Sequence, residues 1–260
     1  MNVQVLVATM NQTDHSLLDK MNIQSDAIVA NQCDRNEIEE FEYKGHRIKY
    51  LSFAERGVGL NRNNALMRAD ADICILADDD IVYIDGYVEK IIKIFNENPK
   101  ADVIIFNLVE NSNNRYIIKK KFRVRFYNYM RFNTPRIAFR LKKITKCGIT
   151  FNLHFGGGAD YSAGEDTLFL HDCLKNKLKI IAVPEYIATV TNNRESTWFK
   201  GYTDKFFIDR GALFARISER WAWLLCLQFA IRHRKKFKNS QSWYKAFWLM
   251  LKGIKEMQRL

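Results

Sequence analysis

The chain has 260 residues, 47% of them hydrophobic, and a formal net charge of +12 at pH 7. This length and content favour one α/β domain with an appendage, or two small domains. The longest apolar stretch, residues 221–231, is interrupted by Gln228 and is shorter than the roughly 20 residues of a membrane-spanning helix, which excludes a transmembrane protein. Residues 1–7 begin at once as a strand, so no targeting segment is expected. Five widely spaced cysteines without a CxxC pair indicate reduced thiols in a cytosolic protein and disfavour a zinc site.

The charge is divided unevenly along the chain. Residues 1–110 contain 11 Lys and Arg against 19 Asp and Glu, whereas residues 111–260 contain 30 against 10. In the second part, residues 115–146 carry 12 basic residues and no acidic one, and residues 232–238 form a second basic cluster. Such clusters either attract polyanions or an anionic membrane surface, or form a solvated face.

The first 110 residues alternate strand and helix patterns. Strands are expected at residues 3–8, 27–30, 48–53, 71–76 and 102–108, and helices at residues 16–21, 62–68 and 86–96. This order predicts βαβ units with a largely parallel sheet and right-handed crossovers.

The pattern changes after residue 110. The basic, aromatic segment at residues 116–140 fits strands, a helix or a mobile acceptor loop, and the pattern does not decide between them. A glycine-rich stretch at residues 155–166 leads into a helix at residues 167–174, and a strand at residues 179–183 closes the core. Glu165 and Asp166 then lie in the first turn of that helix.

The last 40 residues contain two apolar helical faces. One face consists of Tyr244, Phe247, Trp248, Leu251 and Ile254, which follow a helical spacing. The other consists of Trp221, Leu224 and Leu225. These faces either pack on the core or dock the protein at a membrane interface through the basic cluster between them.

Three consecutive carboxylates, Asp78, Asp79 and Asp80, follow the apolar run at residues 73–77. Like charges this close raise one another's pKa, so a triplet is most stable facing water or a cation. Open sheets bind ligands at the carboxyl ends of strands in an α/β pattern, so the functional interpretation of the triplet is a divalent metal site. The structural alternative is a solvated acidic turn.

Four segments in this order carry a resemblance to a known family: VLVATMN at residues 5–11, RGVGLNRNNAL at 56–66, ILADDD at 75–80 and GGGADYSAGEDTLFL at 156–170. Over residues 3–190 the chain resembles the family 2 glycosyltransferases of the GT-A fold, bacterial cell-surface polysaccharide type. The resemblance implies a Rossmann-like, nucleotide-sugar-binding α/β fold with a C-terminal helical appendage. The expected domains are residues 1–192, with a nucleotide-sugar half at 1–110 and an acceptor half at 111–192, and a basic, aromatic helical region at 193–260.

The resemblance also assigns donor-site residues. Thr9 and Asn11 are expected near the uracil and ribose, and Asn31 stands where the family usually has an Asp. An asparagine can still donate and accept hydrogen bonds through its amide. Arg62 is expected to hold a phosphate or a neighbouring carboxylate through its planar fork of donors, with a surface arginine as the plainer alternative.

The Asp triplet corresponds to the DxD signature, which implies Mn²⁺ or Mg²⁺ bound beside a diphosphate. Asp80 is expected as the direct ligand and Asp78 as the partner of the ribose or of a metal-bound water. A second alignment makes Asp79 the ligand instead. The acidic pair implies Asp166 as the catalytic base and Glu165 as a contact of the acceptor sugar, although both carboxylates also suit a helix N-terminus.

The function implied is a metal-dependent, inverting transfer from a UDP-sugar to a saccharide acceptor, expected to be lipid-linked, in synthesis of the capsule, exopolysaccharide or O-antigen type. The protein is then expected in the cytoplasm, peripheral on the inner face of the plasma membrane, with no nucleic-acid partner. The aromatic C-terminal helices could equally form the interface of a homodimer. Two alternatives are a non-catalytic protein that binds polyanions or a membrane surface, and a nucleotidyltransferase. The absence of a glycine-rich, lysine-bearing phosphate loop near the N-terminus argues against the latter.

Overall fold

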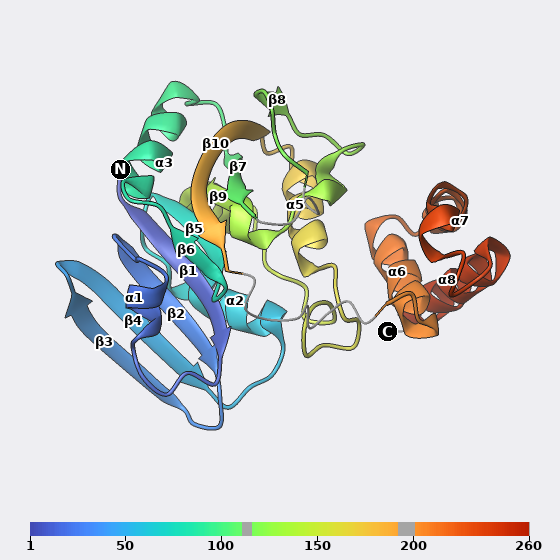
Figure 1. The fold of residues 1–260 in the computed structure, drawn as a ribbon, viewed down its shortest axis with the longest axis horizontal. Helices are drawn as coiled ribbons and strands as arrows, with labels where there is room; N and C mark the ends of the chain where they lie inside the picture. The colour runs from blue at the N-terminus through green and yellow to red at the C-terminus, as the bar shows by residue number, and fades with distance from the viewer. Residues whose placement is uncertain (111–115, 192–200, 260) are drawn as a thin grey trace.

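The structure, a computed structural model, describes residues 1–110, 116–191 and 201–259. One ten-stranded sheet passes through the first two segments, and three helices form a bundle beside it (Figure 1). The strands are β1 Val3–Met10, β2 Asp26–Gln32, β3 Glu37–Tyr43, β4 His46–Phe53, β5 Ile73–Asp78, β6 Ile81–Tyr83, β7 Val103–Val109, β8 Phe122–Arg123, β9 Ile137–Arg140 and β10 Ile180–Val190. The helices are α1 Leu17–Lys20, α2 Val58–Arg68, α3 Tyr87–Glu97, α4 Leu141–Lys146, α5 Glu165–Lys175, α6 Asp204–Ile217, α7 Ala222–Phe237 and α8 Trp243–Met257.

The sheet is mixed, and six of its ten strands run in one direction. Its order is β3-β4-β2-β1-β5-β9-β7-β10-β6, with β8 paired to β10. Strands β4, β2, β1 and β5 are parallel, and β7 and β10 run in the same direction because antiparallel β9 separates β5 from β7. The expected α/β class, with a mostly parallel sheet and C-terminal helices, is therefore confirmed. Both expected halves of residues 1–192 contribute strands to this one sheet.

Burial on both faces explains the continuous apolar strands. In β1 seven successive residues are buried, with Val5 and Val7 in the core cluster that includes α1 and α3, and Leu6 in the cluster that includes α2, α4 and α5. A strand covered on both faces loses the alternation of a half-exposed strand.

Strand β3 was not predicted from the sequence. Four of its seven residues are glutamates, it lies at the sheet edge, and it joins β4 through a tight turn in which Lys44 and Gly45 both have positive φ. Charged side chains protect such an exposed edge from pairing with other chains. Strand β6 was also missed, and β10 continues past Pro184 through a register shift to Val190.

The basic segment at residues 116–140 is resolved in favour of short strands, β8 and β9, joined by two 3-10 turns, with α4 following. Several of its arginines are structural. Arg136 is 2% exposed and donates to the carbonyl oxygens of Phe106 and Tyr116, and Arg140 donates to the carbonyl oxygens of Ala101 and Phe95. Part of the positive charge of this segment therefore belongs to arginines that donate hydrogen bonds to backbone carbonyl oxygens of the core. The first residue of the basic run, at position 115, lies outside the described residues.

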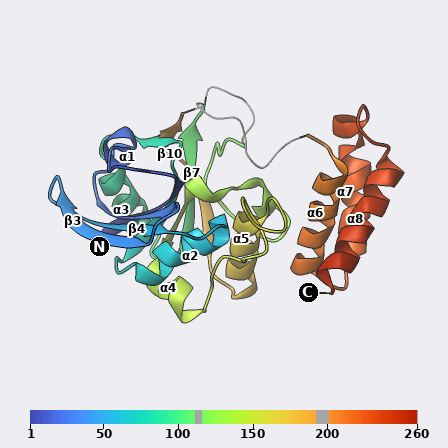
Figure 2. The same ribbon diagram turned by 90° about the horizontal axis from the view of Figure 1, so that it is seen from below.

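The C-terminal bundle packs on the core through α6, with α5 between the sheet and α6 (Figure 2). Helices α6 and α8 cross closely, since a Cβ on Gly211 would lie 1.9 Å from the carbonyl oxygen of Met250. The buried face of α8 thus contains Ala246, Met250, Gly253 and Ile254. Of the predicted apolar face only Ile254 is buried, while Tyr244 and Trp248 are exposed. Helix α6 was not predicted, and the expected boundary between residues 192 and 193 lies outside the described residues.

Candidate active site

The predicted donor residues meet at the carboxyl edge of the parallel strands. In the sheet register Thr9 of β1 is opposite Asn31 of β2, and Ala8 is opposite Asp78 of β5. This edge is where open α/β sheets bind ligands.

The Asp triplet is held in place by three different groups. Arg62 donates from Nη2 to Oδ1 of Asp78 at 2.6 Å, and Thr9 donates from Oγ1 to Oδ2 of Asp79 at 2.6 Å. The carbonyl oxygen of Asp80 accepts from both the backbone N–H and the hydroxyl of Thr191, at 2.7 and 2.8 Å. The three carboxylates are partly buried, and their backbone is fixed between β5 and β6.

Arg62 connects the Asp triplet to the acidic pair, and it lies 103 residues before Glu165 in the chain. Its Nη1 donates to Oε1 of Glu165 at 2.7 Å while Nη2 binds Asp78, and the guanidinium lies 5.5 Å from the ring centre of Phe151. The side chain is 6% exposed. Burial disfavours the cation, yet the carboxylates of Asp78 and Glu165 hold the pKa of Arg62 above its ordinary value. Arg62 is therefore a buried bridge between carboxylates, and the surface alternative is wrong.

Glu165 and Asp166 begin α5, as predicted. Oδ1 of Asp166 accepts a hydrogen bond from the backbone N–H of Thr167 at 2.6 Å. Burial, together with the negative charge of Glu165, raises the pKa of Asp166 to about 7, and Arg62 partly opposes this rise. A carboxylate with this pKa can take up a proton near neutral pH, which is the property required of a general base.

The glycine-rich loop is packed against the start of α2. A Cβ on Gly156 would lie 2.4 Å from Val58 Cγ1 and 2.9 Å from the Glu165 carboxyl, and the residue has φ +108°. The backbone N–H of Val58 donates to the carbonyl oxygen of Gly157 at 2.9 Å. Only glycine permits this approach, which brings the RGVGLNRNNAL and GGGADYSAGEDTLFL segments together.

The residues expected at the nucleotide differ in accessibility. Asn11 is exposed, with a left-handed backbone of φ 54°. Asn31 is buried, and its amide accepts from the backbone N–H of Gln12 and donates to the Gln12 carbonyl and the Ser52 hydroxyl. Asn31 thus shapes the turn after β1, while direct contact with a nucleotide stays a prediction.

Sequence reasoning missed Asn61 and Asp209. Asn61, one position before Arg62, donates from Nδ2 to the carbonyl oxygens of Thr9 and Ala30, which ties α2 to the ends of β1 and β2. The only available signal was a polar residue directly before the helix expected at residues 62–68. Asp209 lies on α6, and no pattern in the sequence connects α6 to the glycine-rich loop.

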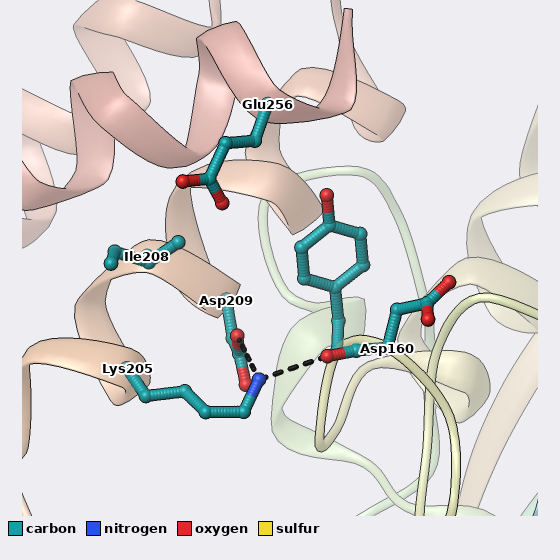
Figure 3. Close-up of a pocket in the computed structure, with 6 residues that line it drawn as sticks. Asp160, Lys205, Ile208, Asp209 and Glu256 are labelled. Carbon is teal, nitrogen blue, oxygen red and sulfur yellow. Dashed lines mark hydrogen bonds and ion pairs between the residues drawn. The ribbon is translucent and has the colours of Figure 1, made fainter. Parts of the chain in front are cut away.

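Asp209 holds that loop from the C-terminal side. It is 5% exposed and accepts from the backbone N–H and the hydroxyl of Ser162, at 3.0 and 2.6 Å. Lys205 donates to Asp209 and to the carbonyl oxygen of Asp160, both at 2.9 Å (Figure 3). These groups border a hollow of about 520 Å³, also lined by Tyr161, Ile208 and Glu256.

The donor atoms at the triplet suit a hard cation. Within residues 1–110, 116–191 and 201–259, no group of three or more His, Cys, Asp or Glu side chains is arranged to hold a metal. Mg²⁺, however, is commonly held by one or two carboxylates together with substrate phosphates. The partly buried carboxylates at the end of β5 fit an ion of that kind.

Comparisons with known proteins place this site in context. The model of glycosyl transferase family 2 matches residues 8–157. Three solved structures of TarS from S. aureus are similar to the chain. The 1–349 fragment in complex with UDP-GlcNAc has a TM-score of 0.67 and 17% identity, with 98% of this chain and 82% of that chain covered. The UDP complex has a TM-score of 0.64 and 16% identity over the same coverage. The structure of the fragment alone has a TM-score of 0.62 and 14% identity, with 100% of this chain and 92% of that chain covered. At these identities the likeness shows the fold. No curated protein sequence matches significantly.

Proposed function

The chain belongs to glycosyl transferase family 2, and we propose that it transfers a sugar from a UDP-sugar to a saccharide acceptor with inversion of the anomeric configuration. The observation that carries the proposal is the position of Arg62, which bridges Asp78 on the expected donor side and Glu165 on the expected acceptor side. One side chain thus sets the spacing between the two halves of the reaction.

A uridine nucleotide is the donor class best supported. Two of the solved structures that are similar in fold to this chain contain UDP-GlcNAc and UDP. In the proposed pose the uracil and ribose lie near Thr9, Asn11 and Asn31, and the diphosphate lies beside the triplet. Arg62 contributes positive charge close to the leaving group.

A divalent cation completes the donor site. Asp80 and Asp78 are the proposed holders of Mn²⁺ or Mg²⁺, with Asp79 as the alternative ligand. When bound, such an ion stabilises the negative charge on the leaving diphosphate.

The proposed chemistry is a single displacement. Asp166 removes the proton from the acceptor hydroxyl, and the hydroxyl oxygen forms a bond to the anomeric carbon as the bond to the UDP oxygen breaks. Glu165, held by Arg62, contacts the acceptor sugar. General-base assistance of this kind contributes roughly 10² to 10⁴ in rate.

The exposed faces of α7 and α8 support a membrane-bound acceptor. Seven large apolar side chains of this region, called the aromatic patch below for their five aromatic members, are 43% to 66% exposed: Trp221, Trp223, Leu224, Ile231, Trp243, Tyr244 and Trp248. No helix in the described residues is long and apolar enough to cross a bilayer. Tryptophan, tyrosine and basic side chains together favour the interface of an anionic membrane. We therefore place the enzyme on the cytoplasmic face of the plasma membrane, acting on a lipid-linked saccharide.

Co-sedimentation with anionic liposomes tests this docking. The double variant Trp223→Ala/Trp248→Ala should lose most of its binding, whereas Tyr127→Ala, which removes a 79%-exposed aromatic residue outside the patch, should bind as the wild type does. Unchanged binding of the double variant would refute the patch as the docking surface. A dimer in solution that the double variant dissociates would assign the patch to self-association instead.

The transfer itself is tested by release of UDP from a panel of UDP-sugars, with Mn²⁺ or with EDTA. Asp80→Asn should lose the release that wild type shows, and the matched control Asp72→Asn, at the opposite, exposed end of the run before the triplet, should retain it. Failure of the wild type to bind UDP, or a product that retains the donor's anomeric configuration, would contradict the proposal.

A further inference from the structure

Arg210 lies next to the two residues of α6, Lys205 and Asp209, that are hydrogen-bonded to the glycine-rich loop. Because Asp209 binds Ser162 and Lys205 binds the carbonyl oxygen of Asp160, this part of α6 has a fixed position relative to the loop that leads to Asp166 (Figure 3). Arg210 follows Asp209 directly in the helix, so its backbone is fixed as well.

The guanidinium of Arg210 is held between two aromatic rings. Its central carbon lies 5.4 Å from the ring centre of Phe206 on α6 and 5.4 Å from that of Phe229 on α7. The side chain is partly buried and makes no hydrogen bond or ion pair with any residue that the structure describes. Burial lowers the pKa of Arg210, and among charged neighbours Asp166 opposes this most strongly.

The N–H groups of the Arg210 guanidinium lack hydrogen-bond acceptors among the residues that the structure describes. A guanidinium carries five N–H donors, and aromatic faces stabilise its charge without accepting conventional hydrogen bonds. Removing a cation from water is unfavourable unless it is paired. The planar fork matches a carboxylate or a phosphate through two parallel hydrogen bonds.

We propose that Arg210 binds a phosphate group of the acceptor and so seats the acceptor hydroxyl beside Asp166. This assignment rests on the proposed function, in which Asp166 is the base. The base must contact the acceptor, and α6 covers the start of the helix that carries Asp166, since a Cβ on Gly164 would lie 2.9 Å from Cδ1 of Leu213, one turn after Arg210. Among charged groups, Asp166 also acts most strongly on Arg210. Arg62, by contrast, already binds the triplet, where the donor diphosphate is placed. The phosphate belongs to a sugar phosphate or to a phosphate link in the acceptor chain.

Calorimetric titration of a phosphate monoester tests the site directly. Glycerol 3-phosphate is the probe and glycerol the neutral control, each titrated with and without UDP and Mn²⁺. Three variants are compared: Arg210→Gln removes the charge, Arg210→Lys keeps the charge without the fork, and Arg216→Gln removes an exposed arginine of the same helix. Circular dichroism confirms that each variant is folded.

The expected result is that wild type and Arg216→Gln bind glycerol 3-phosphate but not glycerol. Arg210→Gln should weaken phosphate binding by about tenfold or more, the effect of losing one charge-assisted contact. Arg210→Lys should bind with an intermediate affinity, and the affinity for UDP should stay within about twofold in all variants.

Three outcomes would overturn the proposal. Wild type without phosphate binding, or equal weakening by Arg210→Gln and Arg216→Gln, would show that Arg210 forms no specific anion site. Loss of UDP affinity in Arg210→Gln would assign the arginine to the donor diphosphate rather than to the acceptor. Failure of wild type to bind UDP contradicts the proposed donor instead, and the titration without UDP still measures the anion site.

Discussion

Replacing Asp166 by asparagine should stabilise the protein at pH 8 while abolishing its activity. The pKa of Asp166 is raised from 3.8 to about 7, chiefly by burial. The unfolded chain therefore releases this proton at lower pH than the folded chain does. As pH rises from about 4 to about 7 the folded state loses stability relative to the unfolded state, and the loss is complete above pH 7.

The gain in the free energy of unfolding follows from the size of the pKa shift of Asp166. About 3 pKa units at 1.36 kcal/mol each set an upper limit of about 4 kcal/mol. The carboxyl is partly exposed and shares its environment with Glu165 and Arg62, so roughly half of this is expected. Asparagine can retain the hydrogen bond from Thr167, but it forfeits about 0.3 to 1 kcal/mol of favourable interaction between a negative charge and the helix N-terminus. The net gain is about 1 to 2 kcal/mol.

Thermal unfolding followed by circular dichroism at pH 8 and pH 4 measures this gain. At pH 8 the midpoint of Asp166→Asn should rise by about 2 to 8 °C. At pH 4 the two proteins should differ little, since the carboxyl is protonated in the folded state and, with its ordinary pKa of 3.8, only partly ionised in the unfolded state. Asp172→Asn, on the same helix, is the matched control. A variant less stable than wild type at pH 8, or equally stabilised at both pH values, would refute the reasoning.

Three further outcomes are expected. Arg62→Gln should lower the free energy of unfolding by about 3 kcal/mol in urea titrations, because it leaves two partly buried carboxylates without their cation; an unchanged midpoint would contradict the bridge. Gly253→Ala should destabilise by about 1 to 3 kcal/mol, since its Cβ would lie 1.9 Å from the carbonyl oxygen of Ile208, while Gly157→Ala, with open space, should change stability by less than about 0.5 kcal/mol. The kcat/KM for transfer should rise with pH through about 7 and then level off, because Asp166 acts as a base only when ionised; a rate that falls over this range would exclude that role.

Local patterns were sufficient for much of the fold. The apolar runs of β1, β5 and β7 and the helical spacing in α3 are properties of neighbouring residues, so they could be recognised without the structure. The triplet Asp78–Asp80 and the pair Glu165–Asp166 were likewise identified as candidate sites, because clustered carboxylates at element ends are visible in the sequence itself. Strand β3 escaped prediction because its glutamates, which suit an exposed edge, mask its alternation.

The sequence by itself determined which residues carry charge and in what order the strands and acidic motifs follow. Tertiary structure alone decided that Arg62 joins Asp78 to Glu165, that Arg136 binds carbonyl oxygens of the core and that Asp209 of α6 binds Ser162 of the glycine-rich loop. The reason is physical. Sequence periodicity reports the environment of residues a few positions apart, whereas ion pairing and a raised carboxyl pKa depend on distance and burial between segments 16 to more than 100 residues apart, which only packing sets.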